Sequence, residues 1–289
     1  MPTSTNATAT YDDIAPLICV TRPYYALQDL HSTRPGRVTA TVPIEASPGR
    51  QTQVISVGEV GRHLAVLGLS AAATSSPAPG RRHYYLASRA VGRMYPAGET
   101  PAPGPLTGTA VVQGQNRRQV VAHTELRDSA GALIARMDVQ YRVMPAATFH
   151  RLMGAPGEAD AKGPDNPYAS AMPVRDVSVH EQSGSAKLDV TAEMCRGHFD
   201  GFPALPVSMA SYASFDVFHR VLDELAGPDA RWRCGAFRLK ADHLAAAGQT
   251  CTVDIEPTKP RLGEQAFSGT VRTAEQRTAA RIWVDYDLV

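Results

Sequence analysis

The chain has 289 residues, which is enough for one large domain or two domains of ordinary size with buried cores. Its 29 basic and 28 acidic residues leave a formal net charge of +1. This charge is too small to attract nucleic acid or an acidic membrane surface to the chain as a whole. Hydrophobic residues make up 43%, yet no stretch reaches the ~18 apolar residues of a membrane-spanning helix. We therefore expect a globular protein without a membrane span.

The cysteines and the N-terminus carry little sign of export or metal binding. Cys19, Cys195, Cys234 and Cys251 form no CxxC pair and no Cys/His spacing typical of a metal site. We expect no bound metal, and reduced thiols favour a cytoplasmic protein. Residues 1–12 are polar and lack the basic and apolar segments of a signal peptide, so we expect them to be disordered.

The first half of the chain reads as a strand, a helix and four more strands. Residues 36–44 alternate as a strand does, and residues 61–75 form an apolar, Ala/Leu-rich helix. Runs rich in β-branched and aromatic residues follow at 82–95, 106–114, 118–128 and 132–144. The Pro/Gly-rich stretch 153–173 then predicts a linker, which bounds a first domain at 13–152.

The second half repeats this order. A strand is predicted at 185–194 and a helix at 206–227, followed by strands at 231–244, 249–257, 266–275 and 277–289. The predicted helix starts, Gly61 and Pro206, lie 145 residues apart (206 − 61). We interpret the chain as a duplicated α+β unit, with a second domain at 174–289. Each unit packs an antiparallel sheet on one helix, and two units pair side by side.

The sequence "GHFDGFPALP", residues 197–206, stands directly before the second helix. It resembles the His-Phe-Pro-Gly-x-Pro signature of the hotdog-fold 3-hydroxyacyl thioester dehydratases of bacterial fatty-acid synthesis. The likeness covers most of residues 186–289, and the first half is similar more loosely, which implies a double hotdog in one chain. Two positions differ, since Asp200 replaces a proline and Val207 a glycine. The matching residues are His198, Phe199, Gly201, Pro203 and Pro206.

The resemblance implies a lyase that dehydrates or hydrates a 3-hydroxyacyl group held on acyl carrier protein or coenzyme A, in lipid or polyketide-type biosynthesis. It implies no cofactor beyond the phosphopantetheine that carries the substrate. A neutral histidine suits the role of base near pH 7, so His198 is the candidate. Backbone N–H groups at a helix start can stabilise the enolate oxygen, which makes Val207 and Gly201 candidate donors. Phe199 and Phe202 are candidates to line the substrate site.

The acid of such a site is missing. The family places a carboxylate fourteen residues after the histidine, where this chain has Tyr212, and Asp216 follows one helical turn later. Tyr212 and Asp216 are therefore both candidates for catalysis. Because the family builds each site from both hotdogs, His198 is expected to meet the first helix. There the residue 145 positions before Tyr212 is Leu67, a candidate to line the substrate site. Near the start of that helix, Glu59 and His63 are candidates to supply the acid or to line the site. The alternative for Glu59 is a purely electrostatic role at the helix N-terminus.

Two other functions remain open. A hotdog thioesterase or acyltransferase could use Glu59 or Asp216 on the same substrates. A non-catalytic acyl-binding module would explain the incomplete acid–base pairs. The expected partners are acyl carrier protein or acyl-coenzyme A, with no nucleic acid, and the chain is expected to be a monomeric pseudo-dimer or a homodimer.

Overall fold

A single antiparallel sheet runs through both halves of the chain. The computed structural model describes residues 9–96, 104–153, 166–199, 201–227, 229–258 and 265–289. Within them, 13 strands follow the order β1-β2-β3-β5-β6-β7-β4-β10-β13-β12-β11-β9-β8. The strands are β1 (Ala9–Thr10), β2 (Gln28–Arg34), β3 (Arg37–Val42), β4 (His83–Met94), β5 (Leu106–Gln115), β6 (Gln119–Arg127), β7 (Leu133–Pro145), β8 (Arg175–His180), β9 (Ser183–Asp189), β10 (Trp232–Ala241), β11 (Thr250–Pro257), β12 (Gln265–Thr273) and β13 (Thr278–Leu288). The helices are α1 (Tyr11–Ile18), α2 (Val57–Thr74), α3 (Ala146–Met153) and α4 (Val207–Ala226), with a 3-10 turn at Glu193–Cys195.

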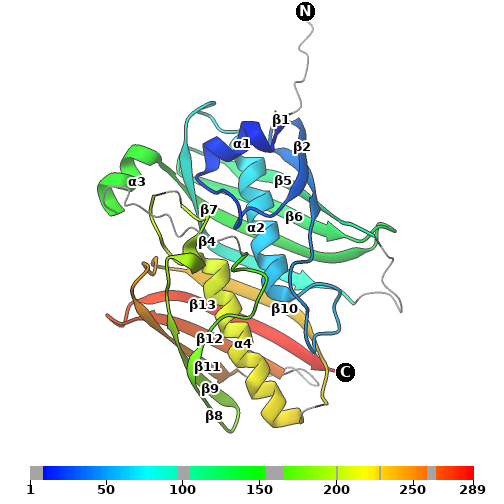
Figure 1. Cartoon of the computed structure of the whole chain (residues 1–289). Coiled ribbons are helices and arrows are strands. Elements are labelled where there is room, and N and C mark those ends of the chain that lie inside the picture. The colour runs from blue at the N-terminus through cyan, green and yellow to red at the C-terminus, as the bar shows by residue number, and fades with distance from the viewer. Residues whose placement is uncertain (1–8, 97–103, 154–165, 200, 228, 259–264) are drawn as a thin grey trace, which may run out of the picture.

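The two halves repeat one arrangement, as the sequence predicts. A hairpin, β2–β3 or β8–β9, precedes a long helix, and four strands follow it. The strand order of one half mirrors that of the other about the central β4–β10 pair. These two strands pair antiparallel from Ala236 opposite Arg93 to Lys240 opposite Arg89 (Figure 1). The joined sheet therefore places the two units side by side, as the sequence analysis expects.

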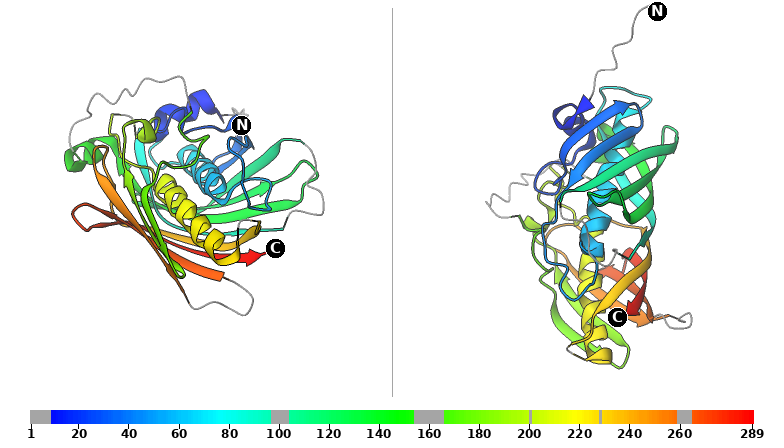
Figure 2. Two further views of the ribbon diagram at one scale, coloured as in Figure 1. Left: turned by 60° about the horizontal axis from the view of Figure 1, so that its bottom comes forward. Right: turned by 90° about the vertical axis from the view of Figure 1, so that its right-hand side faces the viewer.

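Both long helices lie on the concave face of the sheet. Helix α2 contacts β3, β5, β6 and β7, while α4 contacts β9, β11, β12 and β13. The strands supply alternate buried residues to this face, as in β13, where Ile282 and Val284 are buried and Arg281 and Trp283 are exposed. The left view of Figure 2 shows the sheet curving around both helices.

The two helices also touch each other. They meet where Gly58 of α2 faces the ring of Tyr212, and a Cβ on Gly58 would lie only 2.3 Å from that ring. Glycine at this position therefore allows the close approach of the helices. The contact brings the N-terminal parts of α2 and α4 to the middle of the molecule.

Helix α2 starts earlier than the sequence predicts. It begins at Val57 rather than at residue 61, because the Ser56 hydroxyl caps it by accepting a hydrogen bond from the Glu59 N–H. The first residues of α2 and α4 are then 150 residues apart (207 − 57) rather than 145. The helix position that matches Tyr212 is consequently Arg62, and not Leu67.

Several elements differ from the predicted ones or were not predicted. Residues 9–12, which we expect from the sequence to be disordered, form β1 and the start of α1, where Thr10 and Asp13 form a capping box. Strand β9 ends at Asp189, ahead of the predicted end at residue 194, and a 3-10 turn follows it. The described part of the predicted linker packs on the protein, since Tyr168 is buried. Strands β2 and β8 and helices α1 and α3 are additions to the predicted set.

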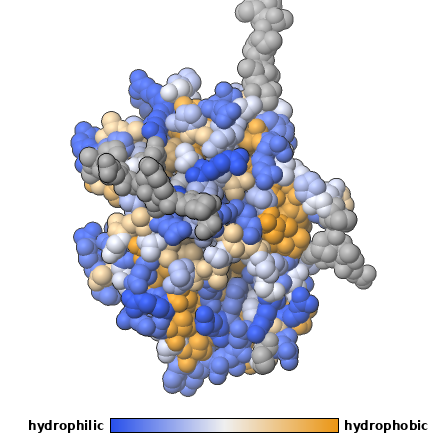
Figure 3. Space-filling view, viewed as in Figure 1, coloured by the Kyte–Doolittle hydropathy of each residue, from blue (hydrophilic) through white to orange (hydrophobic). Residues whose placement is uncertain are grey.

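The face that carries the helices is largely hydrophilic, with hydrophobic side chains visible in separate patches (Figure 3). None of the helices in the described ranges is long and apolar enough to cross a membrane.

Candidate active site

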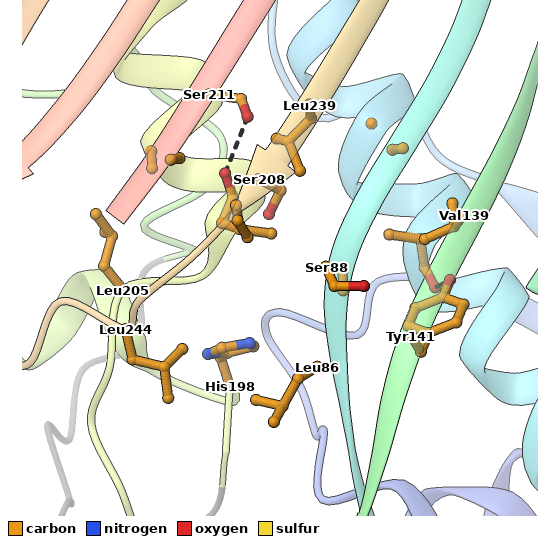
Figure 4. Close-up of a pocket in the computed structure, with 18 of the residues that line it drawn as sticks. Leu86, Ser88, Val139, Tyr141, His198, Leu205, Ser208, Ser211, Leu239 and Leu244 are labelled. Atoms are coloured by element: carbon orange, nitrogen blue, oxygen red, sulfur yellow. Dashed lines mark hydrogen bonds between the residues drawn. The ribbon is translucent and has the colours of Figure 1, made fainter. Parts of the chain in front are cut away.

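A largely apolar cavity of about 270 Å³ lies between the two halves of the chain, and we call it the His198 cavity. Residues of α2, β4 and β7 line one side, and the start of α4, β10 and the loop after β10 line the other. Figure 4 shows His198 between Leu86 and Leu244 at one end, with Ser88 on β4 and Tyr141 on β7 across the cavity. Of the candidate residues from the sequence, His198, Phe199 and Val207 line this cavity.

The loop that carries His198 is held by a segment from the other end of the chain. Gly197 has φ +77°, and its carbonyl oxygen accepts a hydrogen bond of 2.8 Å from the Thr21 N–H. A Cβ on Gly197 would lie 2.4 Å from the Thr21 carbonyl oxygen, so only glycine permits this docking. The docked segment brings the Tyr24 ring to 5.0 Å from the His198 ring, edge-on. The His198 site is thus built from both halves of the chain.

His198 is half-buried and adopts one defined tautomer. Its Nδ1 lies 3.0 Å from the Ala204 carbonyl oxygen, which can only accept a hydrogen bond, so Nδ1 carries the proton. Burial lowers the pKa of His198 to about 4, against a smaller opposing effect of the Ala204 carbonyl. The imidazole is therefore neutral near pH 7, and Nε2 keeps an unprotonated lone pair. The ring stacks on Phe199 with centroids 3.8 Å apart, which fixes its plane.

Hydrogen-bond donors gather beside His198 at the start of α4. Pro206 occupies the N-cap position and has no side-chain cap. Among the described residues, the N–H groups of Val207 and Ser208 have no hydrogen-bond acceptor, and both residues line the cavity. The Ser208 hydroxyl lies 2.7 Å from the Tyr24 hydroxyl. These groups can stabilise negative charge on an oxygen in the cavity.

Tyr212 and Asp216 share a helix face, as predicted, but they face a second space. Both line a separate cavity of about 390 Å³, which we call the Asp216 cavity, together with Ser56 and Trp232. The Tyr212 hydroxyl lies 3.3 Å from that of Ser56. Asp216 accepts a hydrogen bond of 2.8 Å from the Met172 N–H, and burial raises the pKa of its carboxyl to about 6. The structure does not bring either residue together with His198.

Glu59 and His63 are buried away from the His198 cavity. Glu59 Oε1 accepts hydrogen bonds from the N–H groups of Glu45, at 2.6 Å, and Ala46, at 3.2 Å. Burial raises the pKa of Glu59 to about 7, and burial also lowers the pKa of His63 well below its usual value. The Glu59 carboxylate therefore stabilises the backbone at Glu45 and Ala46, and it also accepts a hydrogen bond from the Ser56 hydroxyl at the start of α2.

The same cluster contains Arg62, which is fully buried and forms an ion pair with Glu45. Ligand atoms of Glu45, Glu59 and His63 lie within 4.8 Å of one another, as a metal site requires. The guanidinium already neutralises Glu45, so a metal ion there meets a competing buried cation. Arg62 also packs on the Tyr168 ring, 5.0 Å from its centroid. This arrangement is that of a structural ion pair rather than of a cation site.

The other candidates lie outside the lining of the His198 cavity. Leu67 is buried in the core, in contact range of Gly108 on its own half of the sheet. Phe202 packs in a separate small cluster with Phe149, at 5.4 Å between ring centroids. Gly201 has φ +74° and serves the turn of the loop. Asp200 lies outside the described residues.

Sequence reasoning did not identify Tyr24 or Ser208. Ser208 follows the quoted motif by two residues, so its place at the helix start is a signal that could have found it. Tyr24 is 184 residues away from Ser208 and carries no motif of its own. Only the folded structure brings it to the site.

Comparison with solved structures identifies the fold. The tesB protein of Mycobacterium avium subs paratuberculosis superposes with a TM-score of 0.61 at 12% identity, over 90% of this chain and 96% of that one. The 12:0-ACP thioesterase from Umbellularia californica gives a TM-score of 0.57 at 12% identity, over 88% and 94%. A conserved hot dog fold protein of unknown function from Alicyclobacillus acidocaldarius gives 0.55 at 13%, over 98% and 99%. No protein-family model matches the chain, and no curated protein matches its sequence.

At these identities the likeness shows a shared fold alone, and the chain has the hotdog fold. Several of the similar structures are described as thioesterases, and some of these as putative ones. The comparisons do not support the dehydratase type that the His198 loop resembles.

Proposed function

We propose that this chain, as two tandem hotdog units, hydrolyses acyl thioesters of coenzyme A or of a carrier protein in the His198 cavity. The proposal depends above all on the tautomer of His198, whose Nε2 is an unprotonated base beside a largely apolar cavity. Support also comes from the solved hotdog structures described as acyl-CoA and acyl-ACP thioesterases. No cofactor is required for this reaction.

The chemistry follows from the groups at the site. His198 Nε2 takes a proton from water as the hydroxide attacks the thioester carbonyl carbon. The N–H groups of Val207 and Ser208 stabilise the oxygen of the tetrahedral intermediate. The intermediate then expels the thiolate, and the His198 imidazolium returns its proton to the sulfur. The low pKa of His198 makes this imidazolium a ready proton donor.

Among the described residues no buried acid lines the His198 cavity, and this favours hydrolysis over dehydration. Dehydration expels hydroxide, which is a far stronger base and poorer leaving group than a thiolate, and so needs a proton donor. Hydrolysis expels a thiolate, whose conjugate acid has a pKa of about 8.5, so it can leave without one. Among the described residues the only carboxylate that lines the His198 cavity is Asp242, which is exposed and ion-paired with Lys240 at 2.9 Å.

Dehydration is the second candidate, because the His198 loop matches five positions of the dehydratase signature. A panel of saturated acyl-coenzyme A and 3-hydroxyacyl-coenzyme A substrates separates the two reactions. We expect a thiol-reactive dye to detect release of coenzyme A from both classes, with no enoyl product. Enoyl product without thiol release would instead establish the dehydratase, and binding without either product would establish an acyl-binding protein.

A further inference from the structure

The outer face of the central strands carries three cations in one cross-strand row. Lys240 of β10 lies directly opposite Arg89 of β4 on one side and opposite Arg281 of β13 on the other. Arg238 lies two residues before Lys240 on the same face, and all four side chains are exposed. We call these four residues the basic row. Because Phe237 and Leu239 alternate with them toward the interior, the basic row faces away from the helices.

The basic row is costly to the fold. Directly opposite residues in antiparallel strands lie about 5 Å apart, and like charges at that distance destabilise the sheet. In the described structure, Arg89, Arg238 and Arg281 form no ion pair, and Lys240 pairs only with Asp242. A nearby acid of this face, Asp138, is already engaged with His123 at 2.7 Å. The positive charge is therefore left for a partner outside the chain.

The basic row stands beside one end of the His198 cavity. The β4–β10 pairing ends at the Arg89–Lys240 pair. Beyond it, residues 86–88 of β4, Ala241 at the end of β10 and residues 242–245 after it line the cavity. The cavity therefore lies between the two parting strands, as Figure 4 shows at Ser88 and Leu244. Arg142 and Arg238 belong to the same lining. One end of a ligand in the cavity thus lies beside the basic row.

We propose that the basic row binds the phosphate of the arm that carries the acyl thioester while the acyl group lies in the His198 cavity. Phosphate oxygens accept hydrogen bonds from arginine and lysine, and several cations on one rigid sheet suit such a group. The inference rests on the proposed function for the identity of the acyl substrate. The same phosphate chemistry occurs in coenzyme A and in the phosphopantetheine of a carrier protein.

The test compares ligands with and without phosphate. Calorimetry measures the Kd of coenzyme A, of 4′-phosphopantetheine and of pantetheine, which lacks phosphate, with wild type and with Arg89→Ala/Lys240→Ala. We expect the double variant to bind the phosphate-bearing ligands about tenfold or more weakly, which reflects lost charge-assisted hydrogen bonds. If the double variant binds both phosphate-bearing ligands more weakly, the basic row binds the phosphopantetheine phosphate. If it binds only coenzyme A more weakly, the basic row binds the adenosine phosphates.

Two control variants keep the result specific. Arg136→Ala removes an exposed cation from the same sheet, opposite Arg93 and about 13 Å along β4 from Arg89, and should leave the Kd unchanged. Lys240→Arg keeps the charge and should keep the affinity. Because the double variant relieves like-charge repulsion, its thermal midpoint should equal or exceed that of wild type. Weakened binding therefore does not arise from unfolding.

An unchanged Kd for both phosphate ligands in the double variant overturns the inference, and so does an equal loss in Arg136→Ala. The same effect can be measured kinetically as the ratio of kcat/KM for acyl-coenzyme A to kcat/KM for acyl-N-acetylcysteamine, which lacks phosphate. This ratio should be about tenfold lower in the double variant than in wild type. If wild type binds coenzyme A through the basic row but hydrolyses no thioester, the inference stands and the proposed function fails. If it hydrolyses thioesters with a Kd independent of the row, only the inference fails.

Discussion

Replacing Gly197 by alanine tests how the two halves build the His198 site. Alanine at φ +77° costs about 1 kcal/mol in backbone strain. Its Cβ would lie 2.4 Å from the Thr21 carbonyl oxygen, where ordinary contacts begin at 3.4 Å, so the docked segment must move by about 1 Å. That movement lengthens the 2.8 Å hydrogen bond from Thr21 to Gly197, with a loss of about 1 kcal/mol.

These terms predict that Gly197→Ala lowers the free energy of unfolding by about 2–3 kcal/mol, which is about 3–5 °C in Tm for a chain of this size. Because Tyr24 moves away from His198 and Ser208, kcat/KM for thioester hydrolysis should fall about 100-fold. Calorimetry and a thiol-release assay measure the two effects.

The matched control is Gly80→Ala, since Gly80 has φ +72° but no atom within 4 Å of an added Cβ. It should lose only the strain of about 1 kcal/mol and keep its kcat/KM. Equal losses of stability and activity in the two variants would refute the reasoning, because the clash with Thr21 would then have no effect.

Three further predictions concern the titratable groups. Because neutral His198 is the base and burial lowers its pKa to about 4, kcat/KM should stay level from pH 8 to about 5 and fall toward pH 4; a midpoint near 6.5 contradicts the role or the burial of His198. Glu59→Gln and Asp216→Asn should retain kcat/KM, since neither carboxylate lines the His198 cavity, and a loss of thiol release in either variant with its fold intact contradicts this placement. The pKa of Glu59 is raised to about 7, so the folded chain binds more protons than the unfolded chain between pH 4.5 and 7 and loses stability as the pH rises through this range. In urea unfolding at pH 8, the free energy of unfolding of Glu59→Gln should therefore exceed that of wild type by up to about 3 kcal/mol. An equal difference between the two proteins at pH 5 and at pH 8 would contradict the raised pKa.

The duplicated fold could be predicted because its central elements carry strong patterns. The alternation in β13 and the apolar helices recur in both halves at similar spacing. Strands β2 and β8 escaped prediction because they lie near or at the two edges of the sheet and bury little. Every residue of β8 remains at least partly exposed, and charged residues protect such edges from further pairing.

The candidate site could be predicted only in part, for a related reason. The His198 loop is local, and its glycines and prolines mark a tight turn before a helix. Tyr24 reaches the loop through tertiary docking on Gly197, which leaves no periodic signal. The predicted start of α2 at residue 61 left Glu59 outside the helix, whereas the Ser56 cap places it in the first turn and directs its carboxylate to Glu45 and Ala46. The prediction that α2 supplies an acid beside His198 was therefore wrong, because it rested on a helix start at residue 61 instead of Val57.

The most direct test of the proposed hydrolysis is the rate of thiol release by His198→Ala, with and without added imidazole. Wild type should release coenzyme A from an acyl-coenzyme A substrate, and the variant should be about 1000-fold slower because the general base is lost. Free imidazole, which fits the space that the side chain vacates, should restore part of the rate. A folded His198→Ala variant that hydrolyses the substrate as fast as wild type would contradict the role of His198.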